Sequence, residues 1–346
     1  MTDPTPFQLD LREQPAALDR LGAHASEILA DARRLADRPW SRIVLSGMGS
    51  SDFAAIPTWR RLASAGLPVW TIDSGRLLDS PGVLTADTLL VLTSQSGGSG
   101  EVVELLDRLG TDGTASPYVV AISDDASSPL VTAADAWLPL HSGPEATVST
   151  KSYLNTLAVH RALAAAFTGA DLDLFAEIVE AREVVARQLE TLDLTALTAE
   201  AFAGPDRRLA AVGTGDHAST ALLAGLITKE SSKVAFEGFI GGQFRHGPYE
   251  LAGAGLTVFL YGADDARRDG TVEGLAADLV AAGSRVVLVG DSTRTDAVTI
   301  PAPGSSVLAR LASETVVAEF AAVGLAAANG VEPGVFAFGS KVTTAL

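Results

Sequence analysis

The fold is decided by the stretch Thr88–Gly100, TLLVLTSQSGGSG, and by the segment EVVELLDRL that follows it at residues 101–109. TLLVLT is a short apolar and β-branched run, which is typical of a buried strand. In EVVELLDRL the apolar side chains at positions 102, 105, 106 and 109 share one helix face. A strand that passes through Ser and Gly residues into a helix indicates an α/β protein.

The same alternation of strand and helix recurs along the chain. Further strands are expected at residues 42–46, 68–72, 118–122, 137–140, 209–212, 256–261, 285–289 and 297–300, and long helices at 151–169, 172–192 and 313–329, the last ending at Gly330. Two segments, SGMGSSDFA at 46–54 and VGTGDHAST at 212–220, each follow a strand and open a helix with glycines at the turn. We therefore expect two similar α/β units, each a mostly parallel sheet with helices on both faces.

Composition limits the classes of function. The chain has 346 residues, of which 47% are hydrophobic and 19% are charged, so two folded domains are expected and disorder is excluded. The lack of cysteine excludes disulfides, thiolate metal sites and a cysteine nucleophile. A net charge of −17 disfavours nucleic acid and anionic membranes as partners. We see no signal peptide and no uninterrupted apolar run of about 20 residues, so no membrane-spanning helix and a cytoplasmic location are expected.

The first candidate site is the turn TSQSGGSG at residues 93–100. Its polar side chains Ser94, Gln95, Ser96 and Ser99 lie where a strand ends and a helix begins. Hydroxyls, backbone amides and the positive end of a helix together suit a phosphate. The alternative is that these are ordinary turn and cap residues. The spacing alone favours neither interpretation.

Three further segments carry candidate residues. The turn GMGSS at 47–51 lacks the full dinucleotide-binding pattern, because position 52 is Asp. Glu230 ends an apolar helical stripe: it is either a proton-transferring carboxylate of raised pKa or, as we favour from the stripe alone, a helix-end residue reaching solvent. His246, in the loop GGQFRHGPYEL, is either a proton shuttle or a surface histidine, and the loop favours neither.

Lys341 lies in the tail EPGVFAFGSKVTTAL at residues 332–346. On the tail alone, a solvated charge is the better interpretation than an amine that forms a Schiff base with a sugar carbonyl. The histidines and carboxylates show no metal-ligand spacing, so neither a metal nor a cofactor is expected.

Taken together, these segments resemble the tandem SIS (sugar isomerase) domain family, which contains the isomerase half of glucosamine-6-phosphate synthase and the aminosugar-phosphate deaminases. The resemblance covers nearly the whole chain and rests on LREQP (11–15), GMGSS, SQSG, VSTKSYL (148–154), the TKE helix end, GGQFRHGP and SKVTT. It implies two flavodoxin-like SIS domains at residues 26–170 and 196–330, after an N-terminal segment at 1–25, with a linker helix at 171–195 and a tail at 331–346.

The resemblance also implies a role for each matching residue. The phosphate is expected on one set of side chains and the sugar on a second set, namely Ser94, Gln95, Ser96 and Ser99 for the phosphate and Gly49, Ser50, Ser51, Thr147 and Ser149 for the sugar. Glu230 is expected to move a proton between C1 and C2. His246 is expected to open the sugar ring from the partner subunit, which makes the protein a homodimer. Lys341 is expected to assist ring opening or to hold the open-chain sugar.

The implied activity is isomerisation or deamination of an aminosugar phosphate such as glucosamine-6-phosphate. With no glutaminase domain and no cysteine nucleophile in the sequence, we expect the reaction to proceed without glutamine. The alternatives are a fructosamine-6-phosphate deglycase, a simple aldose–ketose isomerase, and a non-catalytic module that senses sugar phosphates. Gly334 and Phe336 stand where related deaminases often carry Asp and Pro, which indicates a different sugar.

Overall fold

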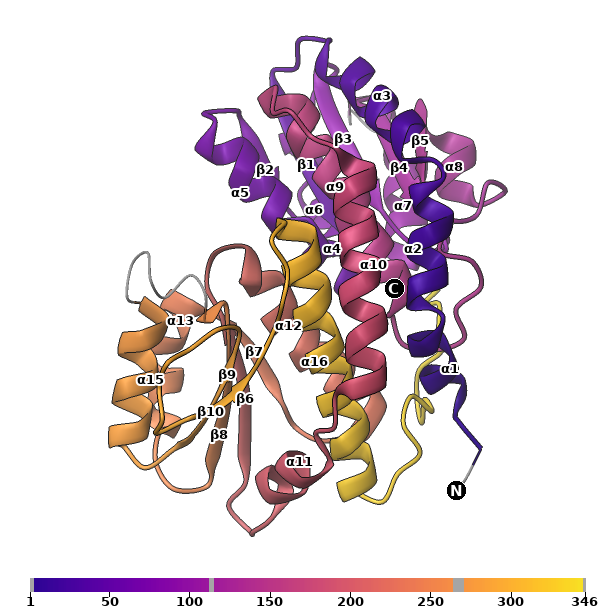
Figure 1. Cartoon of the computed structure of the whole chain (residues 1–346). Helices are drawn as coiled ribbons and strands as arrows, with labels where there is room; N and C mark the ends of the chain where they lie inside the picture. The colour runs from indigo at the N-terminus through magenta and orange to yellow at the C-terminus, as the bar shows by residue number, and fades with distance from the viewer. Residues whose placement is uncertain (1–2, 112–114, 264–270, 345–346) are drawn as a thin grey trace. The chain divides into compact units, whose positions relative to one another are not determined.

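The computed structural model describes residues 3–111, 115–263 and 271–344 (Figure 1). The strands of the first half are β1 (Arg42–Gly47), β2 (Val69–Thr71), β3 (Thr88–Thr93), β4 (Tyr118–Ser123) and β5 (Ala136–Pro139). Those of the second half are β6 (Arg208–Gly213), β7 (Glu237–Ile240), β8 (Leu256–Tyr261), β9 (Arg285–Val289) and β10 (Val298–Ile300).

Helices fill most of the remaining chain. The first half contains α1 (Pro6–Arg12), α2 (Gln14–Gly22), α3 (Ala25–Ala36), α4 (Ser50–Ala54), α5 (Ile56–Ser64), α6 (Ser74–Asp79), η1 (Pro81–Val83), α7 (Gly100–Arg108) and α8 (Pro129–Ala133). Then follow α9 (Lys151–Thr168), α10 (Leu174–Thr191), α11 (Thr195–Phe202), η2 (Gly215–His217), α12 (Ala218–Ser232), α13 (Gly241–Arg245), η3 (Pro248–Leu251), α15 (Thr271–Ala281) and α16 (Val307–Ala328).

Both sheets are parallel and have the same topology. The first has the strand order β2-β1-β3-β4-β5 and the second β10-β9-β8-β6-β7. When each sheet is numbered from its own first strand, both orders read 2-1-3-4-5, which is the order of flavodoxin. The expected α/β class with two parallel sheets is therefore confirmed.

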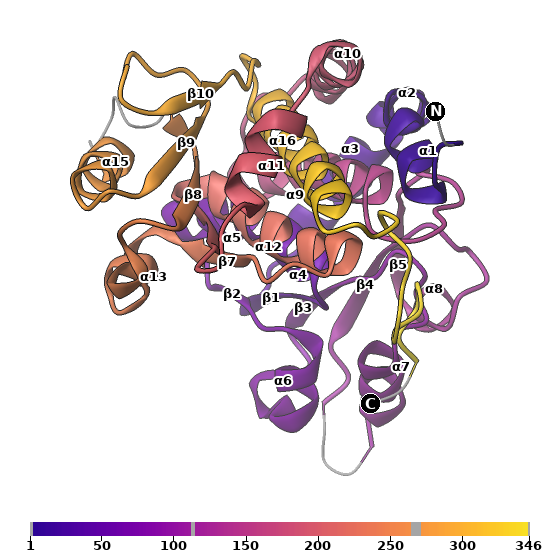
Figure 2. The same ribbon diagram turned by 90° about the horizontal axis from the view of Figure 1, so that it is seen from below.

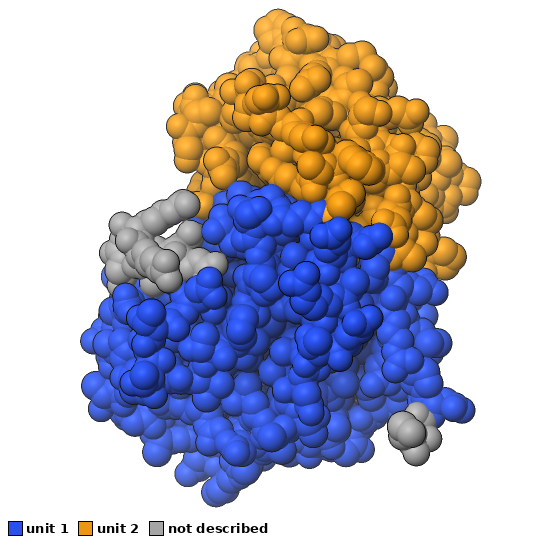
Figure 3. Space-filling view, in the orientation of Figure 1, with its two compact units in different colours: residues 1–15, 146–150, 180–337 blue, residues 16–145, 151–179, 338–346 orange. Residues whose placement is uncertain are grey.

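The chain divides into two compact units, which Figure 3 colours separately. Unit 1 comprises residues 1–15, 146–150 and 180–337 and carries the sheet β6–β10. Unit 2 comprises residues 16–145, 151–179 and 338–346 and carries the sheet β1–β5. Each unit is thus discontinuous in sequence, and the expected domain boundaries stay a prediction.

Helices cover both faces of the sheet in unit 2. Alternate side chains of β1, β3 and β4 pack against α6, α7 and α8, where Leu77, Val102, Leu105 and Leu130 are wholly buried. Figure 2 shows α3 and α9 on the other side of this sheet from α6 and α7. The buried faces explain why these strands read as continuous apolar runs.

Unit 1 repeats this arrangement. One face of β6, β8 and β9 packs against α13 and α15 through Phe244, Leu275 and Leu279. Helix α12 packs against β6, β7 and α16, and the helices α12 and α16 lie on the opposite side of the sheet from α15 (Figure 1).

Helix α16 fits a membrane span by length and composition, with a mean hydropathy of 1.5, although no such helix was expected. However, 72% of its apolar window is buried inside the protein. Core helices pass the same test, so the helix is weak evidence for a membrane span.

Candidate functional site

The turn after β3 forms a compact polar loop, residues 94–99, which we call the serine loop. The hydroxyl oxygens of Ser94 and Ser99 lie 3.1 Å apart across it. The Gly98 amide donates to the Ser96 hydroxyl at 3.2 Å, and the Gly97 amide donates to the Ser94 carbonyl at 3.0 Å. Ser99 is the N-cap residue of α7. The hydroxyls therefore gather at the positive end of a helix, where an anion is stabilised.

The serine loop is fixed from β4 and α8. Gly97 has a φ of +60°, and a Cβ there would lie 2.2 Å from the Ser128 hydroxyl oxygen, so only glycine fits. The Ser123 hydroxyl and the Asp124 amide both donate to the Gln95 carbonyl, at 3.2 and 3.1 Å. These contacts hold the loop in one conformation before any ligand arrives.

The GMGSS turn lies beside the serine loop because Gly47 at the end of β1 pairs with Thr93 at the end of β3. Gly49 is the N-cap residue of α4, and Ser50 and Ser51 are half-buried in its first turn. The register thus brings two expected ligand-binding turns to one carboxyl edge, where parallel α/β sheets bind ligands.

Asp52 lies next to that turn and was not expected from the sequence to be a site residue. Its Oδ1 atom is buried and has no hydrogen-bond partner among the described residues. Burial and the negative charge of Asp73 raise the pKa of Asp52 to about 6, against the opposing charge of Arg76. Asp52 is therefore a titrating carboxyl group at the expected site. Only its burial distinguishes Asp52, and the sequence does not reveal burial.

Lys341 belongs to unit 2, and its ammonium contacts the carboxylate of Glu145. Glu145 accepts two further bonds from Ser152, from its amide at 3.1 Å and from its hydroxyl at 2.6 Å. Burial alone raises the pKa of Glu145, but the Lys341 ammonium and the Ser152 donors outweigh burial and lower the pKa below its ordinary value. The interpretation of Lys341 as a solvated tail charge, which the tail sequence alone favoured, is therefore wrong, because Lys341 is paired with Glu145.

The remaining expected residues lie in unit 1. Glu230 is half-buried in the last turn of α12, and its carbonyl accepts a bond from the Lys233 ammonium. His246 follows α13 and is exposed. Thr147 and Ser149 lie in the short segment 146–150, where the Thr147 hydroxyl is buried. The roles expected for these residues stay predictions.

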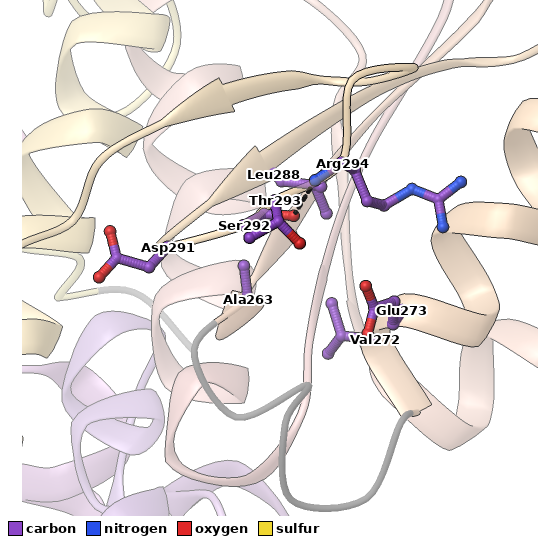
Figure 4. A pocket seen from close by; sticks show the side chains of 8 residues that line it. All are labelled: Ala263, Val272, Glu273, Leu288, Asp291, Ser292, Thr293 and Arg294. Atoms are coloured by element: carbon purple, nitrogen blue, oxygen red, sulfur yellow. Dashed lines mark hydrogen bonds between the residues drawn. The ribbon is translucent and has the colours of Figure 1, made fainter.

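A small pocket lies at the carboxyl edge of the sheet in unit 1 (Figure 4). Its volume is about 60 Å³, and Glu273, Asp291 and Arg294 supply its charged side chains. Arg294 is already paired with Asp296 through two bonds of 2.9 and 2.6 Å. This volume holds a few waters at most and is too small for a sugar phosphate. Across residues 3–111, 115–263 and 271–344, no cluster of three His, Asp or Glu side chains is arranged to hold a metal ion.

Comparison with known proteins identifies one domain. Residues 38–166 match the SIS domain family. These residues include β1 to β5, the GMGSS turn and the serine loop.

Three relatives extend this likeness. Glutamine–fructose-6-phosphate aminotransferase (isomerizing) of Mycolicibacterium smegmatis is 29% identical over 272 residues, which are 72% of this chain and 42% of that protein. The chain therefore spans less than half the length of this relative. The C-terminal domain of glucosamine-fructose-6-phosphate aminotransferase from Francisella tularensis superposes with a TM-score of 0.78 at 19% identity, over 95% of this chain and 98% of that one. Glucosamine-6-phosphate deaminase from Thermotoga maritima superposes with a TM-score of 0.72 at 19% identity, over 98% of this chain and 99% of that one. At such identities the superpositions show the fold.

Proposed function

Because residues 38–166 are an SIS domain, we propose that this protein is a sugar-phosphate isomerase or deaminase built from two SIS domains, acting on an aminosugar phosphate such as glucosamine-6-phosphate. The observation that carries the proposal is the serine loop, which gathers hydroxyls at the start of α7 beside the GMGSS turn. In a chain of net charge −17, such a local device is what an anionic ligand requires.

The phosphate end of the substrate is assigned to Ser94, Gln95, Ser96 and Ser99. These contacts are remote from C1 and C2, so they orient the sugar without taking part in bond changes. Gly49, Ser50 and Ser51 at the neighbouring turn are assigned to the sugar, and so are Thr147 and Ser149.

The reaction begins with ring opening. The C1–O5 bond breaks, the O1 hydroxyl gives up its proton, and O5 gains one, a transfer that we assign to His246. Glu230 then removes the proton from C2 and delivers a proton to C1 through an enolamine. Water adds to the resulting C2 imine and ammonia leaves, so glucosamine-6-phosphate and water give fructose-6-phosphate and ammonia. Lys341 assists ring opening or holds the open-chain sugar.

An aminosugar phosphate is preferred to a simple sugar phosphate because relatives that match this chain in sequence are named glutamine–fructose-6-phosphate aminotransferase. The exposed position of His246 supports its contribution to the site of a partner subunit in a homodimer. A cytoplasmic location remains part of the proposal.

The test incubates the purified chain with glucosamine-6-phosphate and no glutamine, and measures ammonia and fructose-6-phosphate. We expect both products in equal amounts. Glu230→Gln should lower kcat by at least about a hundredfold, because general acid–base catalysis contributes about that factor. Glu183→Gln, an exposed residue of α10, is the matched control and should leave kcat unchanged.

Other outcomes assign the alternatives. Release of a free amino acid from a fructosamine-6-phosphate identifies a deglycase. Interconversion of an aldose and a ketose phosphate without ammonia identifies a simple isomerase. Stabilisation by sugar phosphates with no turnover identifies a sensing module. A fully active Glu230→Gln variant contradicts the role of Glu230.

A further inference from the structure

Most of residues 338–344 are exposed, whereas the Lys341 side chain is not. Phe338, Gly339 and Ser340 are exposed, whereas the Lys341 side chain is only 21% exposed. Its partner, the side chain of Glu145, is 0% exposed. The Lys341 ammonium therefore contacts a buried carboxylate, although the three residues before Lys341 are exposed.

Glu145 is itself held by the start of α9. Ser152 lies in the first turn of this 18-residue helix and donates to both carboxylate oxygens of Glu145. The positive end of a helix and charge-assisted bonds both stabilise a carboxylate. A buried carboxylate is destabilising unless it is paired, and the bonds from Ser152 and Lys341 pair the Glu145 carboxylate.

A second contact fixes the tail two residues further on. The amide of Gly100, the first residue of α7, donates to the Thr343 carbonyl at 2.9 Å. Gly100 directly follows Ser99 of the serine loop. The tail segment that carries Lys341 is thus attached at one point to Glu145 and at another to the helix that begins at the serine loop.

We propose that Glu145 is a positioning residue that holds the Lys341 amine within unit 2, next to the tail segment bound at the start of α7. The contacts from α9 through Ser152 and Glu145 keep the Lys341 amine in the same unit as the serine loop. The consequence for catalysis rests on the proposed function, whereas the positioning itself does not.

The first measurement does not depend on activity. Wild type and Glu145→Gln are treated with formaldehyde and cyanoborohydride, and methylation of each lysine is followed by peptide mass spectrometry. The chain has four lysines, and the exposed Lys229 is the internal control. We expect Lys341 to react about tenfold faster in the variant, because losing a bond between charged groups corresponds to at least that factor. An unchanged Lys341 rate overturns the proposal.

The second measurement tests the catalytic consequence with glucosamine-6-phosphate. Glu145→Gln should lower kcat by about tenfold to a hundredfold through misplacement of the amine, with KM changed by less than about threefold. In a Lys341→Met background, Glu145→Gln should have no additional effect on kcat, because both changes remove the same function. If the effects of Glu145→Gln and Lys341→Met on kcat multiply in the double variant, the catalytic consequence is contradicted. It is also contradicted if Glu145→Gln lowers stability and leaves kcat unchanged, because the pair is then merely structural.

Ser152→Ala keeps the test decisive if Glu145→Gln fails to fold. It removes a single hydroxyl bond to Glu145, and we expect a smaller change of the same sign in both measurements. A wild type that turns over no sugar phosphate contradicts the proposed function but leaves the lysine-labelling test intact.

Discussion

The carboxyl edges of the two sheets have the same strand order but opposite character. In unit 2 the edge carries the serine loop and the GMGSS turn, whose side chains are mostly half-buried. In unit 1 the corresponding edge carries His217, whose Nδ1 lies 2.7 Å from Oε1 of Glu314, with both side chains almost wholly buried. The buried Tyr261 lies close by, and its pKa is raised by burial and by the Glu314 charge. One copy of the fold thus leaves its polar edge accessible, and the other uses its polar groups internally.

This difference shows how a repeated fold divides its tasks. Gly47 and Gly213 end equivalent strands, and each pairs with the last residue of the neighbouring strand, Thr93 or Tyr261. The backbone of the edge is therefore the same in both units, and the side chains that follow decide whether a ligand has access. We expect mutations at the unit 1 edge to change stability without changing binding, whereas mutations in the serine loop of unit 2 should change binding.

The largest effect is expected from His217→Leu. This change leaves the Glu314 carboxylate buried beside an apolar side chain, which should lower the free energy of unfolding by about 3–5 kcal/mol. Urea unfolding measures the loss. His217→Leu combined with Glu314→Met should recover much of it, because no unpaired carboxylate is then buried. If His217→Leu lowers the free energy of unfolding by less than about 1 kcal/mol, or if the folded variant binds sugar phosphates more weakly, the unit 1 edge does not have a purely structural role.

Asp52→Asn tests the carboxyl group at the open edge through pH. The pKa of Asp52 is raised from 3.8 to about 6 in the folded protein. Its protonated form therefore stabilises the fold below about pH 4, and this contribution is lost as the pH rises through 6. Asp52→Asn should raise the free energy of unfolding by about 2 kcal/mol at pH 8, allowing for partial exposure, and leave it unchanged at pH 4. The exposed Asp107→Asn is the control, and an equal response of both variants refutes the assignment.

The smallest effect is expected from Ser94→Ala. Losing one hydroxyl of the serine loop should weaken glucosamine-6-phosphate binding by about tenfold, or about 1.4 kcal/mol, as seen in ligand-induced thermal shifts. Ser219→Ala is the matched change at the unit 1 edge, where the hydroxyl donates to the Asp216 carbonyl at 2.7 Å. It should lower stability and leave affinity unchanged. Equal affinities for Ser94→Ala and wild type would remove the serine loop from the site.

Much of the fold could be predicted because buried parallel strands are apolar along their whole length. Of the ten strands among the described residues, nine were expected, but β7 (Glu237–Ile240) was missed because this short edge strand is half-exposed and contains Glu and Gly. Helix α16 begins at Val307, before the expected residue 313, with Ser306 as its N-cap. Arg310 interrupts the apolar pattern of that first turn, so periodicity alone did not extend the helix.

The candidate site was predictable where its chemistry is local. The serine loop is contiguous, so its strand, turn and helix could be placed from one segment. The pairing of Lys341 with Glu145 joins residues 196 positions apart, and nothing in either neighbourhood indicates the other. The raised pKa of Asp52 arises from burial and from Asp73, which lies on another element.

The discontinuity of the two units has a consequence for synthesis on the ribosome. Unit 2 contains most of the first 179 residues but also the tail from residue 338, which brings Lys341 to Glu145. The buried carboxylate of Glu145 therefore has no Lys341 counter-charge until residue 341 has been translated. Unit 2 therefore gains this contact only after residues 180–337 of unit 1 have been made, and a fragment cut after residue 179 would lack the Lys341 contact of Glu145.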